Sequence, residues 1–234
     1  MATRAHAATR NRADAGGEAA QATRARLLEV AADVFAEAGY QQAKIRQICA
    51  RAGANIALVN YYFGDKLGLY TEVLQQTVKA GHIAAMRGAL EQEGPPEQIL
   101  RALIKARMRG LSRRDEAHRQ FRIFVHELAN PTPAMERVID EVSRPIYGRV
   151  LELIGELLGR ASNDEKTRLC AHSVMGQIML YALASPVLKR LSPGLRMTPK
   201  QLDRIADHIA EFSLAYLRAA RKERSNRNAR AAGK

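Results

Sequence analysis

Two short amphipathic stretches joined by one tight turn, in the first third of the chain, constrain its fold more than any other feature. In residues 44–52, apolar residues recur three or four positions apart, as they do on one face of a helix. Residues 55–63 follow after a turn at Gly53, and Gly64 ends this second stretch. A glycine tolerates the left-handed backbone that such a short turn requires. The spacing therefore predicts two short helices held at a fixed angle, which is the layout of a helix-turn-helix.

The rest of the chain has the pattern of helices separated by glycine and proline. Ala, Leu, Glu, Arg, Gln and Met are abundant, and no segment shows the alternating pattern of a strand, so we predict an all-α fold. The expected order is a disordered basic arm, a three-helix helix-turn-helix domain, a larger helical domain and a disordered basic tail. These parts are expected to cover residues 1–20, 21–68, 69–218 and 219–234.

Capping residues and helix breakers indicate where the helices lie. Gly39 is placed to end the first helix, and Asp65 to cap the fourth. Pro145 lies inside a helical pattern and should kink or split it. Helices are expected at about 24–38, 44–52, 55–63, 66–90, from Pro96 onward, 117–129, from Pro133 onward, 164–184 and 199–218.

The charge balance favours a polyanionic partner. The chain has a formal net charge of +13, which suits nucleic acid or an anionic membrane surface. No stretch approaches the roughly 20 consecutive apolar residues that span a bilayer, and residues 1–21 have no apolar run of the secretory type. We therefore expect a cytoplasmic protein that binds no membrane.

No motif of catalysis or metal binding stands out. The two cysteines, Cys49 and Cys170, are far apart, and the scattered histidines have no metal-ligand spacing. The run GDKLG lacks the glycine spacing of a phosphate-binding loop. We expect no catalytic residue, no metal and no cofactor, with an enzyme as the main rival class. A sequence-blind architectural DNA binder is the other rival, and its binding would depend on salt alone.

The second short helix of the turn has a surface chemistry that suits DNA. With Val59 and Phe63 facing the core, amide and apolar side chains point outward, and these can meet adenine and the thymine methyl group. Tyrosines and lysine can bond phosphates, and an arginine on the preceding helix can reach a guanine or a phosphate. A solvated helix with its tyrosines partly in the core is the alternative that the pattern leaves open. The candidate DNA-binding residues are Lys44, Arg46, Asn55, Ile56, Ala57, Leu58, Asn60, Tyr61, Tyr62 and Lys66.

Residues 24–70 resemble the DNA-binding domain of the TetR family of transcription regulators. The resemblance is carried mainly by the run KIRQICARAGANIALVNYYFGDKLGLY. Three features depart from the family pattern. The threonines that usually precede the second helix are replaced by Ala43 and Lys44, which removes a cap worth roughly 1 kcal/mol. A tyrosine is replaced by Asn60 and a histidine by Tyr62, which puts the family's usual contacts at these two positions in doubt.

A second run, FVHELANPTPAMERVIDEVSRPIYGRVLELI, resembles the CecR-like subgroup of that family. The resemblance implies a homodimeric regulator, by default a repressor, that binds a near-palindromic operator in double-stranded DNA and is released by a small-molecule effector. It implies that the last two long helices, about 164–184 and 199–218, form the dimer interface. The effector pocket should lie among the helices of residues 99–185. Candidate lining residues are Met108, Phe121, Phe124, His126, Met175, Met179 and Tyr181.

Overall fold

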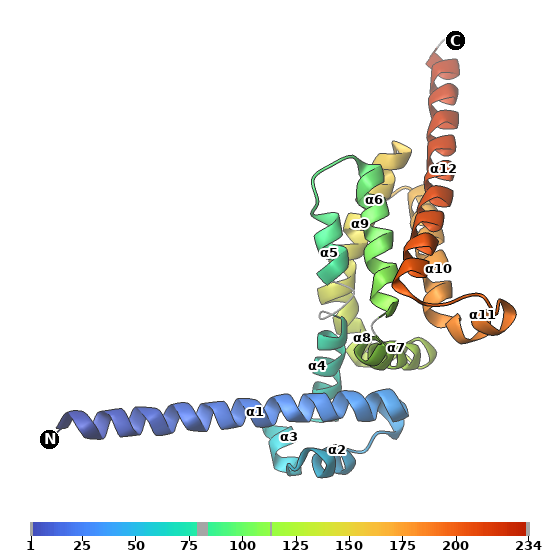
Figure 1. Cartoon of the computed structure of the whole chain (residues 1–234). Coiled ribbons are helices and arrows are strands. Elements are labelled where there is room, and N and C mark those ends of the chain that lie inside the picture. Colours follow the sequence, from blue (N-terminus) through green and yellow to red (C-terminus); the bar gives the residue numbers. More distant parts are fainter. Residues whose placement is uncertain (1, 79–83, 113, 233–234) are drawn as a thin grey trace. The chain divides into compact units, whose positions relative to one another are not determined.

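The computed structural model describes residues 2–78, 84–112 and 114–232, and these residues form helices without a strand (Figure 1). The all-α prediction is therefore confirmed. The chain divides into two compact units. Unit 1 consists of Met1–Gln76 and Arg122–Arg137, and unit 2 of Thr77–Phe121 and Val138–Lys234. The expected boundary at residue 68 differs from this division, because most of the fourth helix and half of a later helix pack with the N-terminal helices.

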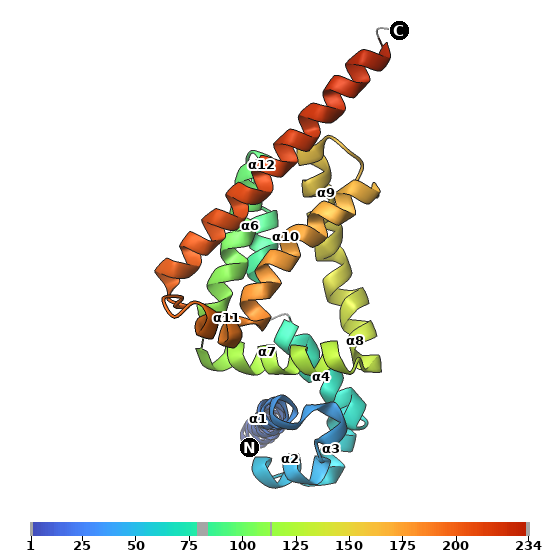
Figure 2. The same cartoon turned by 90° about the vertical axis from the view of Figure 1, so that its right-hand side faces the viewer.

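Unit 1 is built on three N-terminal helices and the helix that follows them (Figure 2). Gly39, with φ 69° and ψ 169°, interrupts the first of these helices, as the sequence predicts. The helices of this unit are α1 (Ala2–Gln42), α2 (Ile45–Ala52), α3 (Ile56–Phe63), α4 (Lys66–Val78), the second half of α7 (Arg114–Ala129) and α8 (Pro133–Val138).

The core of unit 1 is an aromatic cluster surrounded by aliphatic side chains. The Phe35 and Tyr70 rings meet edge to face with centroids 4.6 Å apart, and the Tyr40 ring lies 4.9 Å from that of Tyr70. Such pairs stabilise a core by about 0.5–1.5 kcal/mol beyond their burial. Ile48 of α2 and Val59 of α3 are fully buried, so both short helices are fixed to the rest of the unit.

Unit 2 is a helical bundle in which α6 (Pro96–Arg109) is central. This helix packs most extensively on α12 and α5, and it also contacts α9 and α10 (Figure 2). The remaining elements are α5 (Ala84–Leu90), the 3-10 turn η2 (Gly110–Ser112), the first half of α7, the π-helical turn η3 (Ile139–Ser143), α9 (Arg144–Leu158), α10 (Glu165–Leu183), α11 (Ser185–Leu191) and α12 (Pro199–Ala232).

The helix around Pro145 changes its winding, as expected. A π-helical turn occupies Ile139–Ser143 directly before the proline at the start of α9. Proline has no amide hydrogen and its ring clashes with the carbonyl four residues earlier, so regular α-helical bonding cannot continue through it. A wider turn relieves both problems without ending the helix.

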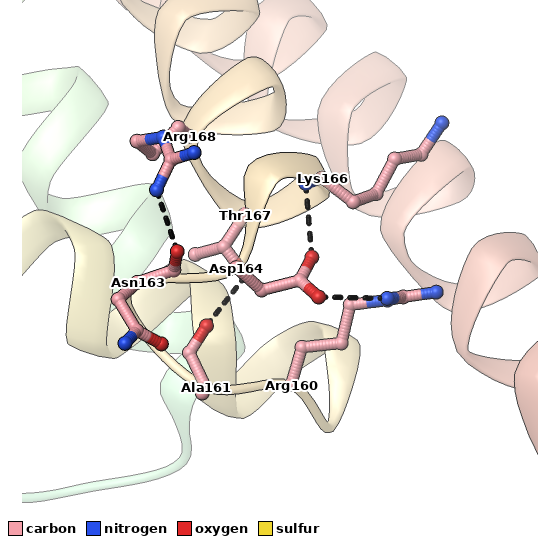
Figure 3. A network of polar contacts seen from close by, with 7 residues as sticks. All are labelled: Arg160, Ala161, Asn163, Asp164, Lys166, Thr167 and Arg168. Atoms are coloured by element: carbon pink, nitrogen blue, oxygen red, sulfur yellow. Dashed lines mark hydrogen bonds and ion pairs between the residues drawn. The ribbon is translucent and has the colours of Figure 1, made fainter.

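The turn between α9 and α10 is stabilised by a small polar network (Figure 3). Asp164 caps α10 by accepting a hydrogen bond from the Lys166 amide at 2.9 Å, and its other oxygen accepts from the Arg160 guanidinium at 3.0 Å. The Thr167 hydroxyl donates to the Ala161 carbonyl at 2.9 Å. These contacts confirm the helix start expected at residues 162–164.

Three features of the fold differ from the sequence predictions. The tail expected to be disordered from residue 219 continues α12 to Ala232, and the expected arm over residues 1–20 has helical backbone from Ala2. Both segments are rich in alanine and arginine, which favour helix without any tertiary contact. The short helix α11 was not predicted. The single helix expected over 66–90 is represented by α4 and α5, and residues 79–83 between them lie outside the described part.

Candidate nucleic-acid interface and effector-binding core

The α2 and α3 helices are joined by the tight turn that the sequence predicts. Gly53 adopts φ 60° and ψ 38°, in the left-handed region, and the Ala54 amide donates to the Cys49 carbonyl at 2.9 Å. Arg51 of α2 reaches back to α1, where its Nη1 lies 3.1 and 3.3 Å from the two carboxylate oxygens of Glu37. The turn and this ion pair fix the α2–α3 corner relative to α1.

Asn55 has a structural role at the start of α3. Its side-chain oxygen accepts a hydrogen bond from the Leu58 amide at 3.0 Å, which is the usual cap of an exposed helix N-terminus. The carbonyl oxygen is thereby occupied, and the side-chain NH2 group remains as the donor that could meet DNA. Leu58 itself is half-buried.

The outer face of α3 is exposed along its length, as the sequence predicts. Tyr61 is 80% exposed and Ile56 is 42% exposed, whereas Val59 on the opposite side is fully buried. Ala57 and Asn60 are also exposed, and the four outward residues are related by steps of three to five positions. A continuous strip with an amide, a phenol and two apolar groups therefore faces away from the core.

The start of α2 adds two exposed cationic side chains. Lys44 occupies the N-cap position and makes no side-chain cap bond, which agrees with the loss of the threonine cap. Arg46 lies in the first turn and is also exposed, while Ala43 is buried. Positive charge at a helix N-terminus is unfavourable for the helix dipole, so its presence points to an anionic partner.

Two of the sequence-predicted contacts are less available than expected. The Lys66 ammonium donates to the Gln41 carbonyl at 3.3 Å and lies 4.7 Å from the centre of the Tyr40 ring. Its partial burial lowers its pKa. Tyr62 is half-buried, with its ring 6.1 Å from that of Phe63. Both residues hold the α3–α4 corner, so their expected phosphate contacts require a rearrangement.

Sequence reasoning missed two residues that orient α3. A Cβ atom on Gly68 would lie 1.9 Å from the Phe63 carbonyl oxygen, so the first turn of α4 can approach the end of α3 only without a side chain. Arg24 of α1 lies over the Phe63 ring at 5.3 Å and forms an ion pair with Glu72 of α4. The glycine in the sequence was a signal for close approach, whereas the ion pair joins residues that are 48 positions apart.

A buried polar network joins α4 to the end of α7 within unit 1. The Tyr70 hydroxyl donates to Glu127 Oε1 at 2.6 Å, and Glu127 also accepts from the amide and the hydroxyl of Thr132 at 3.0 and 2.9 Å. Glu127 is only 1% exposed. Burial, followed by the hydrogen bond from Tyr70 to Glu127, raises the Tyr70 pKa well above its ordinary value. The carboxylate is thus satisfied by three donors and fixes α4 against the α7–α8 turn.

The residues predicted to line an effector pocket do not form one cluster. Met108 is fully buried in the core of unit 2, Tyr181 packs against that core, and Met179 is half-buried. Met175 is 41% exposed, so its assignment to the interior was wrong: Val174 and Ile178 occupy the buried face of α10 and turn Met175 outward.

The remaining pocket candidates lie elsewhere. Phe124 and His126 belong to unit 1, where the His126 ring packs beside Gly39, and this contradicts a place in the core of unit 2. The side chain of Phe121 lies outside the described residues. The sequence gave no means of seeing that α7 divides between the two units.

Searches for other kinds of site within the described residues give two findings. No group of three or more His, Cys, Asp or Glu side chains there could hold a metal ion. None of the described helices is long and apolar enough by itself to span a membrane; α10 and α11 meet the length and composition criteria only together, across a bend of 78°.

Comparison with known families places both parts of the chain. Residues 27–73 match the profile of bacterial regulatory proteins of the TetR family. Residues 96–217 match that of the C-terminal domain of the HTH-type transcriptional dual regulator CecR. The CecR regulator of Shigella flexneri is 28% identical over 171 residues, which cover 69% of this chain and 76% of that protein.

Two further relatives match over shorter segments. The HTH-type transcriptional repressor NicS of Pseudomonas putida is 34% identical over 36% of this chain and 40% of its own. The HTH-type transcriptional activator FasR of Mycolicibacterium smegmatis is 36% identical over 36% of this chain and 37% of its own. These relatives differ in the sign of regulation that their names state.

Solved structures show the same fold. The fatty acid degradation regulator FadR from Bacillus halodurans has a TM-score of 0.60 and 19% identity, covering 81% of this chain and 96% of that one. The FadR regulator from Bacillus subtilis, solved in complex with stearoyl-CoA, has a TM-score of 0.60 and 17% identity, with the same coverage. An exposed α3 strip on a helix-turn-helix, both family matches and the shared fold lead to one conclusion: the chain belongs to the TetR family of transcription regulators and carries a CecR-type C-terminal domain.

Proposed function

We propose that this chain is a homodimeric, ligand-responsive repressor that acts in the cytoplasm, binds a near-palindromic operator and leaves it when a small molecule binds. The observation that carries the proposal is the outward strip of α3, in which Ile56, Asn60 and Tyr61 are exposed opposite a buried Val59. A short helix of this kind fits the major groove, where an amide pairs with adenine and an apolar group meets a thymine methyl group.

Dimerisation is supported by the exposed faces of α10 and α12 in unit 2. The two helices contact each other, and the Gln177 amide donates to the Ser213 hydroxyl across them at 3.3 Å. Large apolar side chains remain on their outer faces, and these are Leu169 (53% exposed), Leu180 (50%), Leu183 (36%), Phe212 (63%) and Tyr216 (46%). Pairing with the same face of a second copy would remove this surface from water and bring four helices together.

A two-fold dimer presents two copies of α3. The operator would then contain two half-sites related by the same two-fold symmetry. A ligand that binds more tightly to a conformation with another separation of the two α3 helices would draw the population away from DNA. The stearoyl-CoA complex of the Bacillus subtilis FadR provides a precedent for a ligand on this fold.

Selection of bound sequences from random duplex DNA, with purified protein at physiological salt, tests the DNA-binding part of the proposal. We expect enrichment of one near-palindromic motif. Enrichment of no motif, with binding that depends on salt alone, would instead support the sequence-blind architectural binder.

The sign of regulation needs its own measurement, because the curated relatives comprise a repressor, an activator and a dual regulator. A promoter that carries the selected motif can be transcribed in vitro with increasing amounts of the protein. We expect fewer transcripts as the operator fills. A rise in transcription would contradict repression and leave specific DNA binding in place.

A further inference from the structure

The buried face of α6 contains one arginine. Leu100 and Ile104 are fully buried, and Leu103 is 5% exposed. Arg107 follows them at the same helical spacing, three and four positions after Ile104 and Leu103, so it continues the face that packs into the unit 2 core. Met108, the next residue along, is also fully buried. A guanidinium on such a face is surrounded by apolar side chains.

Other charged side chains of α6 have partners of opposite charge. Arg109 Nε lies 2.7 Å from Asp203 Oδ1, and Arg109 Nη2 lies 3.0 Å from Asp203 Oδ2. Glu97 forms an ion pair with Arg218. Within the described part of the chain, no carboxylate pairs with Arg107, and loss of hydration alone lowers its pKa. Arg107 is therefore the cation of this helix whose charge the described residues leave uncompensated.

The burial of Arg107 has a particular form. Part of the side chain remains accessible to solvent, although the charged group is strongly desolvated. A solvated surface arginine has the first property alone, and a side chain in a packed core has the second alone. Both together describe a group that borders a hollow inside the bundle. An uncompensated charge in such a place is costly, because the interior cannot replace its hydration.

We propose that Arg107 is the anion-binding residue of the effector site, and that the effector carries a carboxylate or a phosphate on an apolar body. This inference rests on the proposed function, since it defines the ligand to which that regulator responds. An anionic oxygen pair would give the guanidinium its missing partner through two charge-assisted hydrogen bonds. The apolar part of the ligand would lie along the neighbouring Leu103 and Ile104 side chains and the partly buried Tyr181.

The test uses the full-length protein without DNA and compares wild type with Arg107→Met. The probes are dodecanoate, dodecyl phosphate and dodecan-1-ol, which share an apolar chain and differ in the charge and nature of the head group. Calorimetric titration gives their dissociation constants, and thermal unfolding gives the melting temperature with and without each probe. Arg101→Met is the matched control, because it makes the same change on the same helix beside Glu97, a partnered carboxylate.

We expect wild type and Arg101→Met to bind at least one anionic probe about tenfold or more tightly than the alcohol. Arg107→Met should lose that preference. Without any probe, it should melt at a higher temperature than wild type, because an uncompensated charge has been replaced by an apolar chain. Carboxylate and phosphate are distinguished by which of the two probes is preferred.

Either of two results would overturn the inference. One is equal binding, or no binding, of charged and neutral probes by wild type. The other is a lower melting temperature for Arg107→Met than for wild type, because this would show that the guanidinium already has a structural partner. Operator binding by the same preparations is measured separately. Specific binding by wild type and by ligand-free Arg107→Met would leave the proposed function intact even if the anion site is wrong.

Discussion

Asn60 and Tyr61 lie next to each other on the exposed strip of α3, and their side chains make different demands on DNA. An amide can satisfy the donor and acceptor of one adenine edge, which is a sequence-dependent contact. A phenol that is 80% exposed can reach a phosphate, which positions the protein without reading sequence. Substitutions at the two positions should therefore have different signatures.

Asn60→Ala is expected to weaken binding to the selected operator by about 1–3 kcal/mol for each half-site, because the bidentate contact to adenine is lost. Discrimination at one base position should be lost with it. Fluorescence anisotropy with operator duplexes that vary at each position measures both effects. Glu29→Ala, an exposed change on α1, serves as the control and should alter neither. Unchanged base preference in Asn60→Ala would contradict the assignment.

At the scale of elements, the corner between α3 and α4 depends on one missing side chain. Gly68→Ala would place a Cβ 1.9 Å from the Phe63 carbonyl oxygen, so the two helices must move apart. We expect the free energy of unfolding to fall by about 1–3 kcal/mol and operator affinity to fall as α3 is displaced. Denaturant titration and anisotropy measure the two quantities.

Gly88→Ala is the matched control, since nothing lies within 4 Å of the added Cβ and alanine favours helix. It should keep or slightly raise stability and leave operator binding as in wild type. Equal behaviour of the two variants would show that the close approach at Gly68 is not a constraint on α3.

The contact of α4 with the end of α7 predicts a pH dependence. The Tyr70 pKa is raised in the folded state, so between the ordinary value of 10.0 and the raised one only the unfolded chain has released this proton. Stability from this group is complete below about pH 10 and decreases as pH rises above it. At about pH 11, Tyr70→Phe should have lost about 1 kcal/mol less than wild type relative to neutral pH.

At neutral pH the same variant should be less stable by about 1–3 kcal/mol, because Glu127 loses one of its three donors while buried. Urea unfolding at a series of pH values measures both effects. Parallel pH profiles for wild type and Tyr70→Phe would contradict the proposed origin of the alkaline sensitivity.

Local chemistry accounts for what the sequence predicted well. The breaks at Gly39 and Gly53, the caps at Asn55 and Asp164 and the disturbance before Pro145 each depend on a few neighbouring residues, so their signals are present in a short window. The outward strip of α3 followed from helical spacing for the same reason.

Tertiary structure decided what the sequence could not predict. Tyr70 and Glu127 are 57 positions apart, and nothing near either residue indicates the other. Lys66 carries charge that favours DNA by composition, yet the ring of Tyr40 and the carbonyl of Gln41 engage it. Methionines at helical spacing could not be divided into inward Met108 and outward Met175 without the packing of α6 and α10.

At the scale of the whole molecule, function depends on a second copy. Phe212→Glu would place a charge at the centre of the proposed α10–α12 interface, where the phenylalanine is 63% exposed in the single chain. We expect dimerisation to weaken by about 2–4 kcal/mol, since a buried aromatic anchor is lost. Sedimentation velocity should show a monomer at micromolar concentration. Leu128→Glu, at a 52% exposed position in unit 1, is the control and should remain dimeric.

The central claim is that two copies of α3, held by one dimer, read two half-sites. The most direct measurement is native mass spectrometry and anisotropy of the wild-type protein on the selected duplex and on a duplex of equal length with one half-site scrambled. The account predicts two chains on each intact duplex, or a multiple of two, and an affinity at least about a hundredfold lower on the scrambled one, because one set of base contacts is lost. Equal affinity for both duplexes, or one chain per duplex, would contradict it.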